Sequence, residues 1–225
     1  MTSEEPRFRS LSRDQRRDRI VWAAKRVFLE KGLDASSMDD VAAKAGITKP
    51  TVYAHFQSKD ELFSAVVELI KGLFLGKLRS PEVYAAEPVE AVALFCGRFL
   101  ELACWRDAVG YQRVTLAAAA RFPAIAKAVH DTLFAEACRS LATYLRAREL
   151  TRGPERHAEL LLSATTGATV IRHLYGVDDP CADLPDDEMI GAQVDMKKIR
   201  EAVELIASSW NTPPEEAEGD GSECR

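Results

Sequence analysis

Five side chains between residues 48 and 60 offer the hydrogen-bond donors that nucleic-acid recognition requires. They carry amine, hydroxyl or imidazole groups, and they are Lys49, Thr51, Tyr53, His55 and Lys59. Such groups donate to base edges and to phosphate oxygens. The chain has no evident nucleophile triad, phosphate-binding loop, paired catalytic carboxylates or His/Cys cluster with metal-ligand spacing. The pattern therefore favours contact with DNA, and we expect no catalytic residue, no metal and no cofactor.

Residues 36–62 supply the elements that would present these side chains. Ser37 begins a capping-box pattern for a short helix, and Gly46 falls where that helix would end in a left-handed residue. Thr48 can cap a second short helix through its hydroxyl, with Pro50 in the first turn. Two short helices joined by a glycine-containing turn are typical of a helix-turn-helix, which places its second helix in the DNA major groove.

Each polar residue of the second helix has an expected partner in DNA. Lys49 can reach a base edge or a phosphate, and Thr51 can touch a thymine methyl group or a phosphate. Tyr53 and His55 can donate to phosphate oxygens, which positions the protein without specifying the sequence. A solvated polar face is the alternative. Because the helix is poor in Arg, Asn and Gln, we expect few base contacts and some reading of groove shape.

Helix starts offer further phosphate contacts. Lys59 follows Ser58, which forms another capping box with Glu61, and the N-terminus of a helix favours an anion. At Ser37, capping and a phosphate contact through the backbone N–H can coexist. The candidate DNA-binding residues are therefore Ser37, Thr48, Lys49, Pro50, Thr51, Tyr53, His55 and Lys59.

Basic charge is concentrated near the beginning of the chain. Residues 1–60 carry a net charge of +3 and the rest of the chain carries −8, which together give −5. The basic part is the part expected to meet phosphates. Residues 1–10 are expected to form a mobile arm. Five arginines could follow the DNA minor groove or could form a solvated basic tail, and they are Arg7, Arg9, Arg13, Arg16 and Arg17.

The composition limits the class of protein. The chain has 225 residues, of which 47% are hydrophobic and 29% charged, which suits a packed core with an ordinary polar surface. The N-terminus lacks a hydrophobic signal region and no apolar stretch approaches membrane-spanning length, so we expect no membrane segment. The chain has five cysteines, an odd number, and they include no CxxC pair. This pattern favours reduced thiols in the cytoplasm.

The chain reads as helical throughout, because it lacks a sustained period-two alternation of apolar residues. A first helix is expected to begin after Ser12 and to run to Lys31, with Gly32 ending it. A helix over 59–79 is long enough to connect two domains. Pro and Gly breaks separate further helices expected at 87–105, 107–120, 123–150, 154–175 and 196–210.

We therefore predict an all-α protein in which an N-terminal three-helix helix-turn-helix domain is joined to a larger helical domain. Four parts are expected: an arm and helix-turn-helix domain at 1–58, a connecting helix at 59–79, a helical domain at 80–211 and a disordered acidic tail at 212–225.

The N-terminal motif resembles the TetR family of bacterial transcriptional regulators. The pattern Ala-Gly-Ile-Thr followed by Val-Tyr-x-His-Phe-x-x-Lys is specific to that family among helix-turn-helix proteins. The matching residues are Ile20, Ala23, Ala24, Phe28, Gly32, Ser36, Ser37, Met38, Val41, Ala42, Ala45, Gly46, Ile47, Thr48, Val52, Tyr53, His55, Phe56, Lys59 and Leu62. The resemblance implies a three-helix DNA-binding domain, a helical ligand-binding and dimerisation domain, and action usually as a repressor that a small molecule releases.

A weaker resemblance covers residues 111–123. This stretch is similar to the Arg-Leu-Val…Phe-Pro element of the AefR-like subgroup of TetR C-terminal domains. Position 118 is Ala where that subgroup often has Glu, so no role of that acid carries over.

A ligand cavity between the helices of the second domain would be lined mainly by apolar side chains. The candidates are Phe99, Leu102, Trp105, Arg113 and Phe134. Arg113 is the preferred polar candidate, because an arginine within an apolar helix must find a partner or line a cavity; a structural ion pair is the alternative for it. Other polar residues that could face a cavity are Gln112, Thr115, His130, Thr166 and Arg172.

Two segments suit helix pairing across a two-fold axis. Leu160–Leu174 mixes small and apolar residues, and a second apolar face consists of Ile199, Ala202, Val203, Ile206 and Trp210. In the TetR family the last two long helices pair in this way. A two-fold homodimer also suits the reading of two half-sites.

The expected function is that of a ligand-responsive, DNA-binding transcriptional regulator. The favoured form is a dimeric cytoplasmic repressor that a small apolar molecule releases from double-stranded operator DNA. An all-α enzyme or carrier with a vestigial helix-turn-helix, a thiol-based sensor, and an activator remain alternatives. The sequence leaves the effector, the operator and the target genes open.

Overall fold

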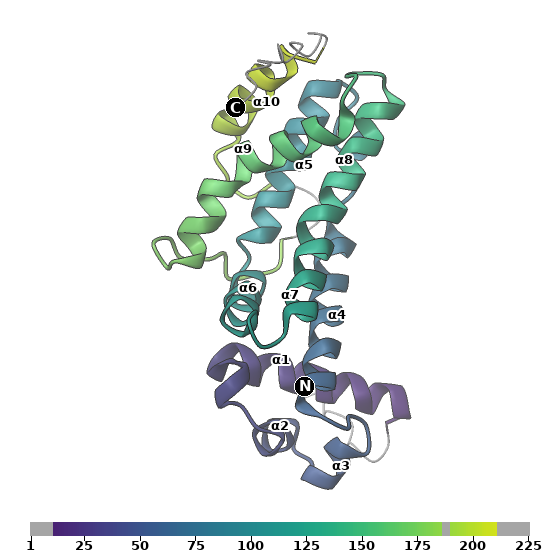
Figure 1. Ribbon diagram of the computed structural model, residues 1–225, viewed down its shortest axis with the longest axis vertical. Coiled ribbons are helices and arrows are strands. Elements are labelled where there is room, and N and C mark those ends of the chain that lie inside the picture. Colours follow the sequence, from purple (N-terminus) through teal and green to yellow (C-terminus); the bar gives the residue numbers. More distant parts are fainter. Residues whose placement is uncertain (1–10, 186–189, 211–225) are drawn as a thin grey trace, which may run out of the picture.

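The computed structural model describes residues 11–185 and 190–210, and in those ranges the chain is built from helices, as expected (Figure 1). An isolated parallel bridge joins Trp105 to Cys181. The first elements are α1 (Arg13–Ala35), α2 (Met38–Ala45), α3 (Lys49–Tyr53), α4 (Lys59–Lys77) and the short turn η2 (Pro81–Val83). The others are α5 (Pro88–Ala103), α6 (Arg106–Ala118), α7 (Pro123–His130), η3 (Asp131–Ala135), α8 (Glu136–Ala147), α9 (Pro154–Leu174) and α10 (Met196–Ala207).

The molecule is elongated, and α1, α2 and α3 form one end of it (Figure 1). Helix α4 leaves this end and runs along the body. Helix α6 lies next to α1 and α7 packs against α6 and α4, while α5, α8 and α9 form the larger bundle and α10 lies near the far end. No helix in the described ranges has the length and apolar character needed to cross a bilayer.

Local capping chemistry determines where the first helices begin and end. Ser12 and Gln15 form a reciprocal capping box at the start of α1, as the sequence predicts. Gly32 breaks the regular helix with φ 79°, in the left-handed region that favours glycine, and irregular helical turns continue to Ala35. At α4 only half of the expected box forms. Ser58 caps the helix, but the carboxylate of Glu61 accepts from the N–H of Gln57.

A shared aromatic core joins the start of α4 to α1 and to α6. The rings of Phe28 and Phe63 meet edge to face at a centroid distance of 5.6 Å, and Phe63 lies 6.1 Å from the ring of Tyr111. Edge-to-face rings add to the free energy gained by burial alone. The orientation of α4 is therefore coupled to both domains.

The expected single helix over 123–150 is wrong in one respect. Helix α7 and helix α8 are joined by five residues of π-helix, Asp131–Ala135. A π-helical turn accommodates an extra residue and rotates the side chains that follow it. Phe134 lies on this turn.

A buried ion pair links α1 to the start of α6. Lys25, which is 7% exposed, pairs with Asp107, and its ammonium also lies 4.5 Å from the ring of Trp22 and 5.6 Å from that of Trp105. Burying a charged amine is unfavourable unless it is paired, so these contacts constrain how the two domains meet.

Two expectations lie outside the described residues. They are the mobile arm at 1–10 and the disordered tail at 212–225.

Candidate nucleic-acid interface and ligand groove

The turn between α2 and α3 has the geometry of a helix-turn-helix. Gly46 has φ 68° in the left-handed region, and the N–H of Ile47 donates to the carbonyl of Ala42 over 3.0 Å. This bond is typical of a Schellman-type helix end. A residue with a side chain at position 46 would be strained in the left-handed conformation that this end requires. The turn therefore fixes where α3 begins relative to α2.

Thr48 begins α3, as expected, but does not cap it through its hydroxyl. The hydroxyl oxygens of Thr48 and Thr51 lie 2.8 Å apart, and no side-chain bond to the helix backbone forms. The carbonyl of Thr48 accepts from the N–H of Thr51 over 3.0 Å instead. The two hydroxyls thus form an exposed pair beside Pro50 at the start of the helix.

The outer face of α3 presents the expected donors. Tyr53 is 45% exposed, whereas Val52 is fully buried beneath the helix. The ammonium of Lys49 pairs with the carboxylate of Asp39 over 2.8 Å, which raises the pKa of Lys49. Both partners are exposed, and such surface pairs contribute little and exchange readily. A phosphate can therefore replace Asp39 as the partner of Lys49.

Basic residues of α1 surround the end of α3. Burial lowers the pKa of His55, and the positive charges of Arg13, Arg16 and Arg17 lower it further. The guanidinium of Arg17 stacks 5.0 Å from the centre of the Phe56 ring. These three arginines belong to helix α1 and not to an arm, and their expected contact with the DNA minor groove stays a prediction. They form a rigid basic cluster beside His55.

The structure gives Lys59 a role other than the expected phosphate contact. Its ammonium donates to the carbonyls of Leu33 over 2.7 Å, Ser36 over 2.9 Å and Asp34 over 3.4 Å. An ammonium has three protons to donate, so these carbonyls account for all of them. Lys59 therefore pins the turn between α1 and α2.

Ser37 is likewise engaged within the protein. Its hydroxyl accepts from the N–H of Asp40 over 3.1 Å, and its own N–H donates to the Asp40 carboxylate over 2.9 Å. The capping box is confirmed. The expected phosphate contact through this N–H is not supported, because the carboxylate already occupies it. Bonds from Lys31 first and Ser37 second lower the pKa of Asp40 to about 2.

Three of the five expected ligand residues belong to the packed core. Phe99, Leu102 and Trp105 are all buried, and Trp105 lies against Lys25 of α1. Arg113 is exposed and donates to the carbonyls of Leu174 over 3.0 Å and His173 over 2.5 Å. It therefore caps the end of α9 and holds it against α6.

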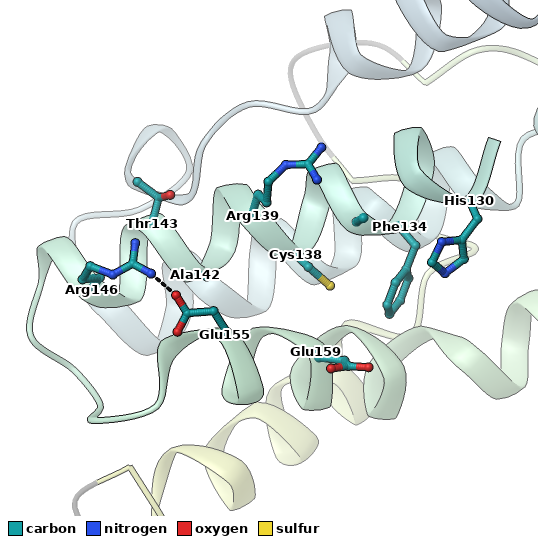
Figure 2. A pocket seen from close by; sticks show the side chains of 10 residues that line it. His130, Phe134, Cys138, Arg139, Ala142, Thr143, Arg146, Glu155 and Glu159 are labelled. Atoms are coloured by element: carbon teal, nitrogen blue, oxygen red, sulfur yellow. Dashed lines mark hydrogen bonds and ion pairs between the residues drawn. The ribbon is translucent and has the colours of Figure 1, made fainter. Parts of the chain in front are cut away.

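Phe134 is the expected ligand residue that reaches a groove. The groove lies between the α7–η3–α8 segment and α9, with a volume of about 540 Å³, and Figure 2 shows the ring of Phe134 and the thiol of Cys138 directed toward α9. Glu155 and Glu159 stand on the α9 side. This volume lies within the range of ligand sites in proteins. Sequence spacing could not show the groove, because it depends on the packing of α8 against α9.

Of the other polar residues considered, His130 lines the groove. Thr166 is buried and donates to the carbonyl of Leu162, and Arg172 pairs with Asp178. Gln112 donates to backbone carbonyls, while the buried hydroxyl of Thr115 has no hydrogen-bond partner among the described residues.

The described cysteines are free thiols. Burial raises the pKa of Cys96 and of Cys104 to about 12, and that of Cys138 to about 11. Thiolate is the reactive form, so these environments disfavour reaction with peroxide at neutral pH. This finding weighs against the thiol-sensor alternative.

The exposed apolar residues of α9 lie on the face opposite its buried side. Leu160, Ala164, Gly167 and Ile171 follow one another at helical spacing there, and Leu205 of α10 is 75% exposed. The expected pairing face of α10 is different in the structure. Its core residues pack within the protomer against α5 and α9, and they are Ile199, Val203, Ile206 and Trp210.

Family models match both halves of the chain. Residues 20–66 match the model described as bacterial regulatory proteins of the tetR family. Residues 90–199 match the model described as the C-terminal domain of AefR-like transcriptional repressors.

Curated relatives match a short part of the chain. The HTH-type transcriptional activator FasR of Mycolicibacterium smegmatis is 47% identical over 58 residues, which is 26% of each protein. The HTH-type transcriptional repressor BepR of Brucella suis is 37% identical over 51 residues, 23% of this chain and 24% of that protein. The chain thus spans about a quarter of the length of these relatives.

Solved structures match over nearly the whole chain. The Flavonoid-responsive Regulator FrrA has a TM-score of 0.70 and 25% identity, covering 87% of this chain and 97% of that one. A TetR-family regulator from Mesorhizobium loti has a TM-score of 0.66 and 22% identity, covering 88% and 98%. At 22% identity, the match to the Mesorhizobium loti regulator shows similarity of fold alone.

Proposed function

Because the chain belongs to the TetR family of bacterial regulatory proteins, we propose that it acts as a homodimeric, cytoplasmic repressor that a small molecule releases from double-stranded operator DNA. The family consists of transcriptional regulators, so the chain is not an enzyme. We divide it as the sequence suggests, into a DNA-binding domain at 1–58, a connecting helix at 59–79, a ligand-binding and dimerisation domain at 80–211, and a tail at 212–225.

The observation that carries this proposal is the geometry of α2 and α3. The Gly46 turn fixes α3 so that Lys49 and Tyr53 point outward, and the α1 arginines flank its end. A helix of this kind can enter the major groove while the flanking arginines contact the phosphates. Pro50 and Thr51, which lie in the first turn of α3, would meet the DNA beside them.

Dimerisation through α9 and α10 is supported by their exposed apolar surface. Ile171 is 53% exposed and Leu205 is 75% exposed, and the small residues Ala164 and Gly167 would allow two copies of α9 to approach closely. A two-fold pair presents two copies of α3, as two half-sites about one helical turn apart require.

Repression and ligand response are supported by the relatives. The C-terminal match is described as a repressor domain, although FasR, which matches over 58 residues, is named an activator. FrrA is named as flavonoid-responsive and resembles this chain over both domains. In the proposed mechanism, a ligand binds more tightly to a conformation whose two α3 helices no longer fit consecutive grooves.

Fluorescence anisotropy with duplex DNA from upstream of the chain's own gene would test the proposal. We expect tight binding that weakens with salt, and Lys49→Gln should reduce the salt slope by about 2, about 1 for each chain of the dimer. Lys197→Gln, an exposed lysine on α10, is the matched control. Binding no stronger than to unrelated duplex would contradict the proposal and favour a vestigial helix-turn-helix.

A further inference from the structure

The groove between α8 and α9 has one unbalanced charge. Arg146 pairs with Glu155 within it, and Arg139 pairs with Glu136 (Figure 2 shows Arg139 directed away from α9). Glu159 has no ion-pair partner in the described part of the chain. Counted together with Glu136, which pairs with Arg139 beside the groove, the two arginines and three carboxylates sum to −1, and Glu159 is the carboxylate to which no arginine of the described ranges is paired.

The wall facing Glu159 is apolar and aromatic. Phe134 and Cys138 project from the α8 side toward α9 (Figure 2). The Glu159 carboxylate lies close enough to Cys138 to raise the pKa of that thiol, in addition to the larger effect of burial. His130 lies beside Phe134 with its ring centroid 6.0 Å away. An aromatic face next to an unpaired carboxylate favours a cation with apolar substituents.

We propose that the groove between α8 and α9 binds a small lipophilic monocation, with Glu159 as its counter-charge and Phe134 as its aromatic contact. This inference rests on the proposed function only in its regulatory consequence. It narrows the expected effector from an apolar molecule to an apolar cation, such as a quaternary ammonium or phosphonium compound.

A chain of aromatic contacts connects the groove to α4. The Phe134 ring meets Phe99 of α5 edge to face at 6.3 Å, and Phe99 meets Phe74 of α4 edge to face at 5.7 Å. Phe134 lies on the π-helical turn, where the regular hydrogen-bond pattern is already interrupted. A ligand that displaces Phe134 therefore repacks Phe99 against the helix that leads to the DNA-binding domain.

Titration calorimetry with two probes of opposite charge tests the site. Tetraphenylphosphonium and tetraphenylborate have nearly the same size and shape, so they separate charge recognition from apolar burial. In sodium buffer at fixed ionic strength, the full-length protein should bind one phosphonium per chain and should bind the borate at least about tenfold more weakly. Equal affinity for the two probes would overturn the proposal.

Matched variants locate the charge that is recognised. Glu159→Gln should weaken phosphonium binding about fivefold, and Phe134→Leu should weaken it about threefold. Glu149→Gln changes the net charge equally in the turn after α8, outside the groove, and should have no effect. Because Glu159 is exposed, its replacement should not impair folding. Identical affinity of Glu159→Gln and the unsubstituted protein would refute the assignment.

Operator binding measured on the same preparations separates this inference from the proposed function. Normal operator binding without charge-selective probe binding would overturn the groove assignment alone. Selective probe binding without operator binding would support the site and refute the proposed function. Phe99→Leu should keep phosphonium affinity but reduce the operator released at saturating probe. Unchanged release would overturn the aromatic route to α4.

Discussion

The DNA-binding end and the helical body of this protein differ in the sequence separation of the residues that form their functional geometry. At the DNA-binding end, capping and turn formation involve residues a few positions apart, such as Ser37 with Asp40 and Gly46 with Ile47. In the body, the groove depends on helices α8 and α9, and its route to α4 joins residues up to 60 positions apart, Phe74 to Phe134. Local chemistry specifies the first region, whereas the second exists only after the whole bundle has packed.

The same contrast appears within one residue type. Lys49 and Lys59 lie ten positions apart in a motif that predicts DNA contact for both. Within the described ranges Lys49 pairs with the exposed Asp39, which a phosphate can replace, whereas Lys59 donates to three backbone carbonyls. The number and burial of their existing partners therefore distinguish a contact residue from a structural one.

The largest expected effect concerns the body, through dimerisation. Ile171→Glu places a charge on the exposed apolar face of α9. A dimer would carry two such charges at the proposed interface. We expect monomers by light scattering and about hundredfold weaker operator binding, because the two half-sites are no longer bound together. Leu116→Glu changes an exposed leucine on α6, 63% exposed against 53% for Ile171, and should leave the dimer intact. A dimeric Ile171→Glu protein would show that the two copies meet elsewhere.

The next effect tests the contact between the two regions. Lys25→Ala leaves Asp107 without its partner and removes the side chain that contacts Trp22 and Trp105. We therefore expect a loss of about 3 kcal/mol in the free energy of unfolding. Urea unfolding measures it, and a double-mutant cycle with Asp107→Asn isolates the pair. A loss below about 0.5 kcal/mol, typical of a neutral surface site, would contradict the buried link.

A third test uses the two lysines. Lys59→Met should lower the free energy of unfolding by about 1 to 2 kcal/mol, because three carbonyls lose their donor. It should leave the salt slope of operator binding unchanged. Lys49→Met should do the reverse, reducing that slope by about 2, about 1 for each chain of the dimer, with little change in stability. If Lys59→Met instead reduces the salt slope, the result would support the phosphate contact that the sequence predicts for Lys59.

The smallest effect concerns pH and the cap of α2. The pKa of Asp40 is lowered from 3.8 to about 2 by Lys31 and Ser37. A lowered folded-state pKa gives stability that is present above the unfolded-state value and is lost as pH falls through the folded one. Asp40→Asn should therefore flatten the pH dependence of stability between about pH 4 and pH 2. Glu204→Gln, an exposed change on α10, should not. Parallel curves for Asp40→Asn and the unsubstituted protein would contradict the cap.

Sequence alone was sufficient where a single short segment determines the geometry. Ser12, Ser37 and Gly46 each have the structural role that their neighbours predict, and the all-α fold follows from the helical period and its breaks. The π-helical turn at 131–135 was not visible, because one additional residue in a long helix leaves composition and approximate period unchanged.

The rest of the candidate site required three-dimensional packing. Arg113 was placed in a cavity from its apolar neighbours, but it caps the carbonyls at the end of α9, 60 residues away. The apolar face of α10 suits either a partner or the protein's own core, and periodicity cannot distinguish between them. Glu159 gave no sequence signal, because its significance lies in the pairing of the arginines across from it.

The central claim is that α3, held by the Gly46 turn, docks this protein on a two-fold operator. Its most direct test is the stoichiometry and affinity of binding to DNA from upstream of the chain's own gene, followed by anisotropy and light scattering. We predict two chains per site and affinity at least about a thousandfold above that for unrelated duplex. A Lys49→Gln, Tyr53→Phe double variant should bind both duplexes more weakly, because these side chains contact phosphates. Equal affinity of the unsubstituted protein for both duplexes, or unchanged affinity in the double variant, would contradict the account.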